Sequence, residues 1–180
     1  MDYAIDILKQ SKIKYDWKTI YVGLELSIIK NSDITNYAVE FLSTHQECNN
    51  QFIIELAWGK NDIEYERILE NILKEINDED LLKDSGLWKC EKRKWRFSIL
   101  KHLKEMYQDE PKELLNKIVE VYADFDYPED MERFINYMPP KDGYNPLLYS
   151  EEEHIVRLIS FFNDFLHKEQ QYLQNRKVKK

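Results

Sequence analysis

The sequence predicts an all-α fold, either an irregular multi-helix bundle or a short α-solenoid, with about nine helices. Apolar residues recur at helical spacing along nearly the whole chain. The 180 residues include only 4 glycines and 5 prolines, whereas an all-β fold needs many turns. Because 43% of the residues are hydrophobic, a sizeable core can form. We expect a single helical domain over residues 1–180, with a basic flexible tail at about 174–180.

Capping residues locate the helices of the first half of the chain. A short helix is expected at residues 2–10, and Asp16 and Ser32 can cap the two helices that follow. The segment "NNQFIIELAWG" forms a fourth helix, which Gly59 can end. A fifth helix, at about residues 61–77, has apolar residues at i, i+4 and i+8.

The second half of the chain carries longer helices. Gly86 is expected to break the chain before a helix at about residues 92–107. The apolar face of that helix is expected to hold Trp95, Ile99, Leu103 and Met106. Pro111 suits the first turn of the next helix, and Ser150 and Glu153 form an S-x-x-E capping box for the last one.

Charge is unevenly distributed along a chain whose formal net charge is -8. Residues 89–104 hold seven Lys or Arg and one acid, whereas residues 105–153 hold fourteen Asp or Glu and four Lys or Arg. The two segments either pair with each other on adjacent helices, or the acidic segment is presented to a basic partner. The overall acidity gives no reason to expect binding to nucleic acid or to an anionic membrane.

The acidic stretch "YADFDYPEDMERFINYMPP", residues 122–140, is the most unusual segment. Asp126 and Glu129 have the spacing of a capping box, so a helix is expected to start near residue 126 and to end at the Pro139-Pro140 pair. Pro128 is tolerated in its first turn. The buried side of this helix is expected to hold Phe134, Met138 and Tyr137.

The acidic stretch also raises a metal-binding alternative. Asp124 and Asp126 form a D-x-D pattern, and carboxylate oxygens bind divalent cations such as Mg²⁺. A site of this kind needs a third acid or a phosphate-binding loop, and the sequence has no P-loop or dinucleotide fingerprint. We therefore expect no metal, no cofactor and no catalytic residues, and keep a divalent-metal enzyme as the weakest alternative.

Other reactive residues give no stronger signal. The two cysteines, Cys48 and Cys90, have no metal-ligand spacing and suit a reducing compartment. No apolar run reaches the roughly 20 residues that span a bilayer, and the N-terminus does not resemble a secretory signal. These features predict a cytoplasmic location. The basic segment "KCEKRKWRFSILKHLK" interleaves cations with aromatic rings, but its apolar residues repeat as the core face of a helix, so nucleic-acid binding is not expected.

Three segments together resemble a bacterial family of unknown function. They are "DWKTIYVGLELSIIKNSDITNYAVEFL", "NNQFIIELAW" and "VYADFDYPEDMERFINYMPP", and the likeness spans about residues 15–140. The resemblance implies no enzymatic activity and supplies no catalytic residues. It implies a small acidic protein similar to the immunity proteins that accompany bacterial polymorphic toxins.

The sequence therefore favours a protein-binding function. An acidic surface attracts a basic partner, such as a toxin domain, and aromatic residues often anchor protein interfaces. The predicted binding residues are Asp124, Asp126, Tyr127, Glu129, Asp130 and Glu132. A helical scaffold that binds peptides in a solenoid groove remains the main alternative.

Overall fold

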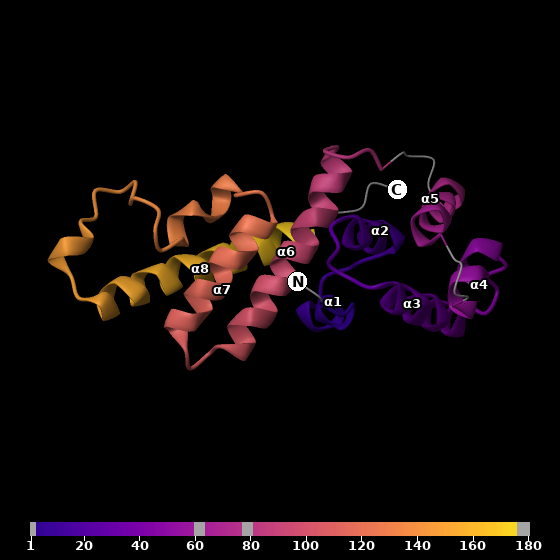
Figure 1. The fold of residues 1–180 in the computed structure, drawn as a ribbon, viewed down its shortest axis with the longest axis horizontal. Coiled ribbons are helices and arrows are strands. Elements are labelled where there is room, and N and C mark those ends of the chain that lie inside the picture. The colour runs from indigo at the N-terminus through magenta and orange to yellow at the C-terminus, as the bar shows by residue number, and fades with distance from the viewer. Residues whose placement is uncertain (1–2, 60–63, 77–80, 176–180) are drawn as a thin grey trace. The chain divides into compact units, whose positions relative to one another are not determined.

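The computed structural model describes residues 3–59, 64–76 and 81–175. Within these ranges it holds eight α-helices, two short 3-10 helices and no strand, which confirms the all-α prediction (Figure 1). The chain groups into two compact units, one ending at Trp95 and the other beginning at Arg96. Each unit has its own buried apolar residues. The expectation of a single domain stays a prediction.

Unit 1 is built from short helices. These are α1 (Asp6–Ser11), α2 (Trp17–Glu25), α3 (Asn31–Thr44), α4 (Gln51–Trp58), α5 (Tyr65–Ile76) and the first half of α6 (Gly86–Met106). Helix α4 packs against α3 and α5, and α5 also packs against α2. Burial of their apolar faces is the main source of stability in helices this short.

Two of the three predicted helix ends in unit 1 are confirmed. The Asp16 side chain accepts the N–H of Lys18 (3.0 Å) and the Thr19 hydroxyl accepts the N–H of Asp16 (3.2 Å), which completes a capping box. Gly59 ends α4 in the left-handed conformation, with φ of 62°. The prediction for Ser32 is wrong, because α3 begins one residue earlier, at Asn31.

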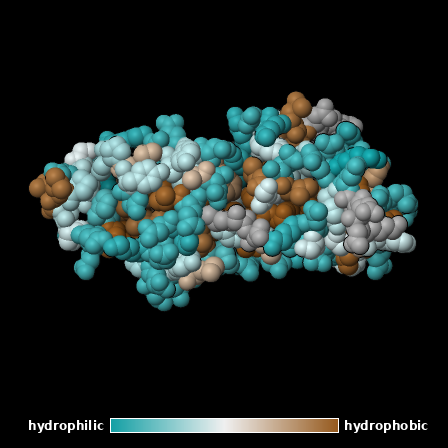
Figure 2. Space-filling view, in the orientation of Figure 1, coloured by the Kyte–Doolittle hydropathy of each residue, from teal (hydrophilic) through white to brown (hydrophobic). Residues whose placement is uncertain are grey.

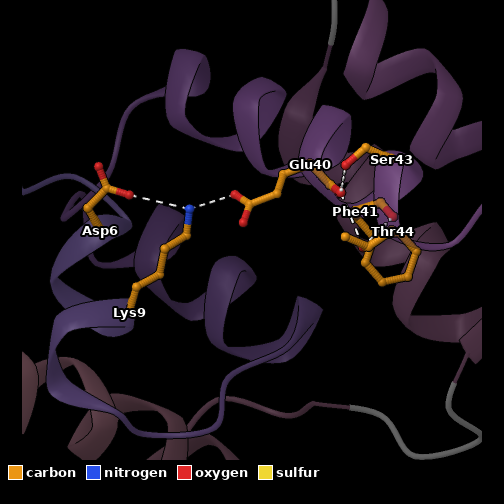
Figure 3. A network of polar contacts seen from close by, with 6 residues as sticks. All are labelled: Asp6, Lys9, Glu40, Phe41, Ser43 and Thr44. Carbon is orange, nitrogen blue, oxygen red and sulfur yellow. Dashed lines mark hydrogen bonds and ion pairs between the residues drawn. The ribbon is translucent and has the colours of Figure 1, made fainter.

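A polar network links α1 to α3 (Figure 3). The Lys9 ammonium lies 2.6 Å from a Glu40 carboxylate oxygen and 3.4 Å from one of Asp6. Its hydrogen bond to Glu40 raises the pKa of Lys9. The hydroxyls of Ser43 and Thr44 donate to the backbone carbonyl of Glu40, at 2.7 and 3.2 Å. Exposed pairs of this kind contribute little to stability.

A tight contact joins α2 to α6 inside unit 1. The indole N–H of Trp95 donates to the backbone carbonyl of Thr19 at 2.7 Å, and the Trp95 side chain is fully buried. A Cβ atom placed on Gly23 would lie 2.6 Å from the indole ring. The buried carboxylate of Glu91 accepts the Thr19 hydroxyl and lies 2.6 Å from the Lys94 ammonium. Only a residue without a side chain fits where α2 crosses this ring.

Helix α6 begins earlier than the sequence predicts. The Ser85 hydroxyl accepts the N–H of Trp88 at 3.1 Å, and Gly86 is the first residue of the helix instead of a break before it. Three of the four predicted core residues of α6 are buried, but Met106 is 59% exposed and that part of the prediction is wrong.

Unit 2 is organised around the longest helix. It contains the second half of α6, α7 (Pro111–Asp124), η1 (Glu129–Phe134), η2 (Pro146–Leu148) and α8 (Glu151–Asn175). Helix α8 packs against α7 and η1 (Figure 1). Pro111 occupies the first turn of α7, as predicted. The predicted capping box before α8 is also confirmed, since Ser150 and Glu153 bond each other's backbone N–H groups at 2.9 and 3.2 Å.

Residues 176–180 of the predicted basic tail lie outside the described residues, and α8 extends to Asn175. In the described part of the chain, no helix combines the length and apolar character needed to cross a membrane.

Candidate functional site

The acidic stretch begins where α7 closes in a Schellman turn. The N–H of Tyr127 donates to the carbonyl of Tyr122 (2.9 Å), and the N–H of Asp126 donates to that of Ala123 (3.1 Å). The rings of Tyr122 and Tyr127 pack edge to face, 5.3 Å apart, which supplies the apolar contact common in this motif. Tyr122 is buried, whereas Tyr127 is 62% exposed. The turn therefore holds Tyr127 at the surface.

Two consecutive residues of this turn have a left-handed backbone. The φ angles are 64° at Asp126 and 54° at Tyr127. Glycine is usual at such positions, because an L side chain there costs about 1–2 kcal/mol. The chain instead keeps a carboxylate and a phenol ring, and local strain of this kind is a pointer to function.

The predicted capping box of Asp126 and Glu129 is wrong. Asp126 belongs to the end of α7, and Glu129 opens a 3-10 helix, η1, instead of an α-helix. Pro128 stands at the N-cap position, and no side chain caps η1. The predicted helix does not reach the proline pair, because η1 ends at Phe134.

The buried side of η1 also differs from the prediction. Phe134 is buried, with its ring 5.6 Å from that of Phe162 and 5.1 Å from that of Phe165 on α8. Met131 is fully buried, although the sequence pattern did not single it out, and Tyr137 is 57% exposed. A 3-10 helix turns more tightly than an α-helix, which changes the residues that face α8.

Two of the six predicted binding residues are held in ion pairs. Asp130 accepts two hydrogen bonds from Arg96, at 2.6 and 2.8 Å, and the Arg96 side chain is only 6% exposed. Glu132 lies 2.6 Å from the Lys141 ammonium, and this hydrogen bond raises the pKa of Lys141. The basic and acidic segments thus contact each other at Arg96, so Asp130 and Glu132 have structural partners.

The other four predicted residues form an exposed group. Asp124, Asp126, Tyr127 and Glu129 follow one another through the turn and into η1, and each is exposed. We call these four residues the acidic turn. The predicted site therefore consists of an exposed turn that a partner can reach and two carboxylates, those of Asp130 and Glu132, that are held in ion pairs.

A pocket of about 400 Å³ opens beside the acidic turn. Its lining comes from the acidic stretch, from the residues just after it and from the start of α8: Glu129, Glu132, Arg133, Met138, Pro139, Pro140, Lys141, Asp142, His154, Arg157 and Leu158. No pattern in the sequence indicates this pocket, because its walls come together only when α8 packs against η1.

Aromatic stacking shapes the α8 side of the pocket. The Arg157 guanidinium lies over the ring of Tyr144 at 3.9 Å and donates to the Asp142 carboxylate. Partial burial works against it, but the N–H of Tyr144 and the Arg157 guanidinium hold the pKa of Asp142 below its ordinary value. The Tyr144 ring also stacks on His154 (5.7 Å) and on Tyr149 (4.7 Å). These contacts fix the loop before α8.

The same loop carries two strongly exposed leucines. Leu147 and Leu148, in η2, are 92% and 75% exposed. The hydrophobic projection at the left edge of Figure 2 lies over this loop, which is orange in Figure 1. Exposed apolar groups on an ordered loop are typical of protein-binding surfaces.

The metal alternative gains no support from the geometry. Within the described residues, no group of three His, Cys, Asp or Glu side chains could hold a metal ion. Asp124 lies in the last turn of α7 and Asp126 in the Schellman turn, and neither lines the pocket. Of the histidines, His45 is the C-cap residue of α3, and its ring stacks on that of Phe41 at 4.1 Å.

The sequence matches a family of uncharacterized proteins conserved in bacteria (DUF2247) over residues 5–170. The chain belongs to this family. The DUF2247 match extends beyond both ends of the region, residues 15–140, over which the family likeness was expected. It includes the acidic turn and every residue that lines the pocket. No curated protein and no solved structure matches the chain.

Proposed function

We propose that this DUF2247 protein is a protein-binding domain that attracts a basic partner through the acidic turn. The observation that carries the proposal is the exposure of three carboxylates and a tyrosine on a turn whose backbone is fixed by hydrogen bonds. A fixed turn loses little conformational entropy on binding, and a tyrosine among carboxylates is a common interface anchor.

Charge supports a basic partner. Residues 105–153 have an excess of ten acidic over basic side chains, and all four residues of the acidic turn are exposed. Complementary charge accelerates association with a basic surface. The resemblance to immunity proteins suggests a bacterial toxin domain as the partner class, with the chain blocking its basic active site.

Affinity capture tests this proposal. The protein is used as bait in lysates of bacteria that carry it, at about 0.05 and 0.5 M salt, which shortens the screening length about threefold. We expect one basic protein in stoichiometric amount, retained at low salt and lost at high salt. The double variant Asp124→Asn, Glu129→Gln should capture much less of it.

A matched control removes two exposed carboxylates from unit 1, with the substitutions Glu47→Gln and Glu55→Gln. This control has the same net charge as the test variant and should capture the partner like the wild type. Equal capture by both variants, or a test variant that is markedly less stable than the control, would show that the acidic turn is structural and that the function lies elsewhere.

A further inference from the structure

The pocket beside the acidic turn has an apolar wall that the proposed function does not use. Met138, Pro139, Pro140 and Leu158 supply this wall. Proline rings are rigid, and Leu158 is 3% exposed, so the wall is preformed. A pocket of about 400 Å³ falls within the range of small-ligand sites. It is large enough for one long side chain.

The cations of the pocket are already engaged. Lys141 pairs with Glu132, and Arg157 pairs with Asp142 while stacking on Tyr144. The Arg133 guanidinium lies over the ring of Phe161 at 3.8 Å. An anionic ligand would have to displace Glu132 from Lys141 or Asp142 from Arg157.

The Glu129 carboxylate differs from the paired side chains of Lys141 and Arg157. Glu129 is the exposed first residue of η1 and lies at the pocket, and among the described residues none makes an ion pair with it. Its charge acts on nearby Lys141, whose ammonium is bonded to Glu132. The carboxylate left for a ligand at this pocket is therefore that of Glu129, next to an apolar wall.

The geometry points to a pocket that receives an arginine or lysine side chain of the basic partner. The aliphatic part of that side chain lies along the proline pair, Met138 and Leu158, and its cationic end meets Glu129. Long cationic side chains commonly bury their stems and keep the charge at a polar rim. This inference rests on the proposed function, since it names the anchor by which the same partner binds.

An NMR titration tests the pocket without the partner. Amide shifts of the full chain are followed on addition of N-acetyl-arginine methylamide, with the leucine and glutamate analogues and putrescine in parallel. We expect the arginine compound to move signals of residues 129–141 and 154–158 with a dissociation constant on the order of 1 mM. The leucine and glutamate compounds and putrescine should bind at least about fivefold more weakly.

Two variants and one control test which residues of the pocket bind the arginine compound. Glu129→Gln should weaken the arginine compound about threefold to fivefold, as expected for a partly exposed ion pair. Met138→Ser should weaken it through the apolar wall, and Glu47→Gln should change nothing. Any of three results would overturn the inference. The leucine compound could bind as tightly as the arginine compound, the glutamate compound or putrescine could bind more tightly than it, or the titration could give no saturable shift.

The two proposals fail in different ways. If the partner is captured through the acidic turn but Met138→Ser leaves its dissociation rate unchanged, the protein-binding function stands and the anchor does not. If Met138→Ser speeds dissociation about tenfold while Asp124→Asn mainly slows association, both stand.

Discussion

The contact between Gly23 and Trp95 predicts that a single methyl group on α2 destabilises unit 1. The perturbation is Gly23→Ala. The new Cβ would lie 2.6 Å from the Trp95 ring, whereas ordinary contact begins at 3.4 Å, so the groups must separate by 0.8 Å. Trp95 is fully buried, and its N–H is bonded to the Thr19 carbonyl, so the ring cannot move freely.

The expected change in the free energy of unfolding has three contributions. Overpacking of a core costs about 1–3 kcal/mol, and a weakened hydrogen bond costs up to about 1.5 kcal/mol. Replacing a helical glycine by alanine returns about 0.5–1 kcal/mol. We therefore expect a net loss of about 1–3 kcal/mol in the free energy of unfolding.

Urea unfolding followed by tryptophan fluorescence measures this loss. The four tryptophans, Trp17, Trp58, Trp88 and Trp95, all lie in unit 1, so the signal reports that unit. With a slope of about 2 kcal/mol per M, the midpoint should fall by about 0.5–1.5 M.

A matched glycine provides the control. Outside its chain neighbours and its own helix backbone, no atom of the described residues lies within 4 Å of a Cβ built on Gly86, so Gly86→Ala should leave the midpoint unchanged or slightly raised. Adding Trp95→Phe to Gly23→Ala should recover part of the loss, because the smaller ring makes room, and the two substitutions should therefore be non-additive. A Gly23→Ala protein as stable as the wild type, or a double variant whose losses add, would rule out the clash with Trp95.

Three further predictions concern unit 2. Asp130→Ala should lower the free energy of unfolding, measured with a chemical denaturant, by about 1–3 kcal/mol, because it leaves the buried Arg96 guanidinium without its acceptor. A loss below about 0.5 kcal/mol would show that the ion pair is solvated. Met131→Ala should lower the free energy of unfolding by about 2–5 kcal/mol and Tyr137→Ala by less than about 1 kcal/mol, because Met131 is buried and Tyr137 is exposed. Similar losses for the two variants would indicate that the segment is an α-helix instead of η1. The hydrogen bonds of the capping box lower the pKa of Glu153, so the stability that the Glu153 carboxylate contributes is complete above the ordinary carboxyl pKa of 4.5 and is lost as the pH falls through the lower folded-state value. Glu153→Gln should therefore flatten the acid side of a curve of unfolding free energy against pH. An unchanged slope would contradict this assignment.

Local signals in the sequence predicted some helix ends correctly and others wrongly. Asp16, Gly59 and Pro111 act where the sequence places them, because a cap depends on residues within one turn. The same logic misassigned Asp126. A D-x-x-E spacing looks the same whether the aspartate starts a helix or lies just beyond the end of the preceding one, and this Schellman turn lacks the glycine that would have identified it.

The candidate site could be predicted only in part. The acidic residues of the stretch are visible in the sequence, but the pairing of Asp130 with Arg96 depends on a distant contact. Arg96 and Asp130 are 34 residues apart, and the pocket joins Glu129 to Leu158 across the loop before α8. No periodicity or motif within one segment reports such a contact.

Helix α6 has a consequence for any attempt to divide this protein into fragments. The boundary between the units falls inside this continuous helix, between Trp95 and Arg96. A fragment ending at Trp95 would leave the last carbonyls of a shortened helix without intrahelical partners, next to its most deeply buried indole. During synthesis, the first unit likewise cannot complete its final helix until residues of the second have left the ribosome. Split-protein and truncation designs should therefore cut outside residues 86–106.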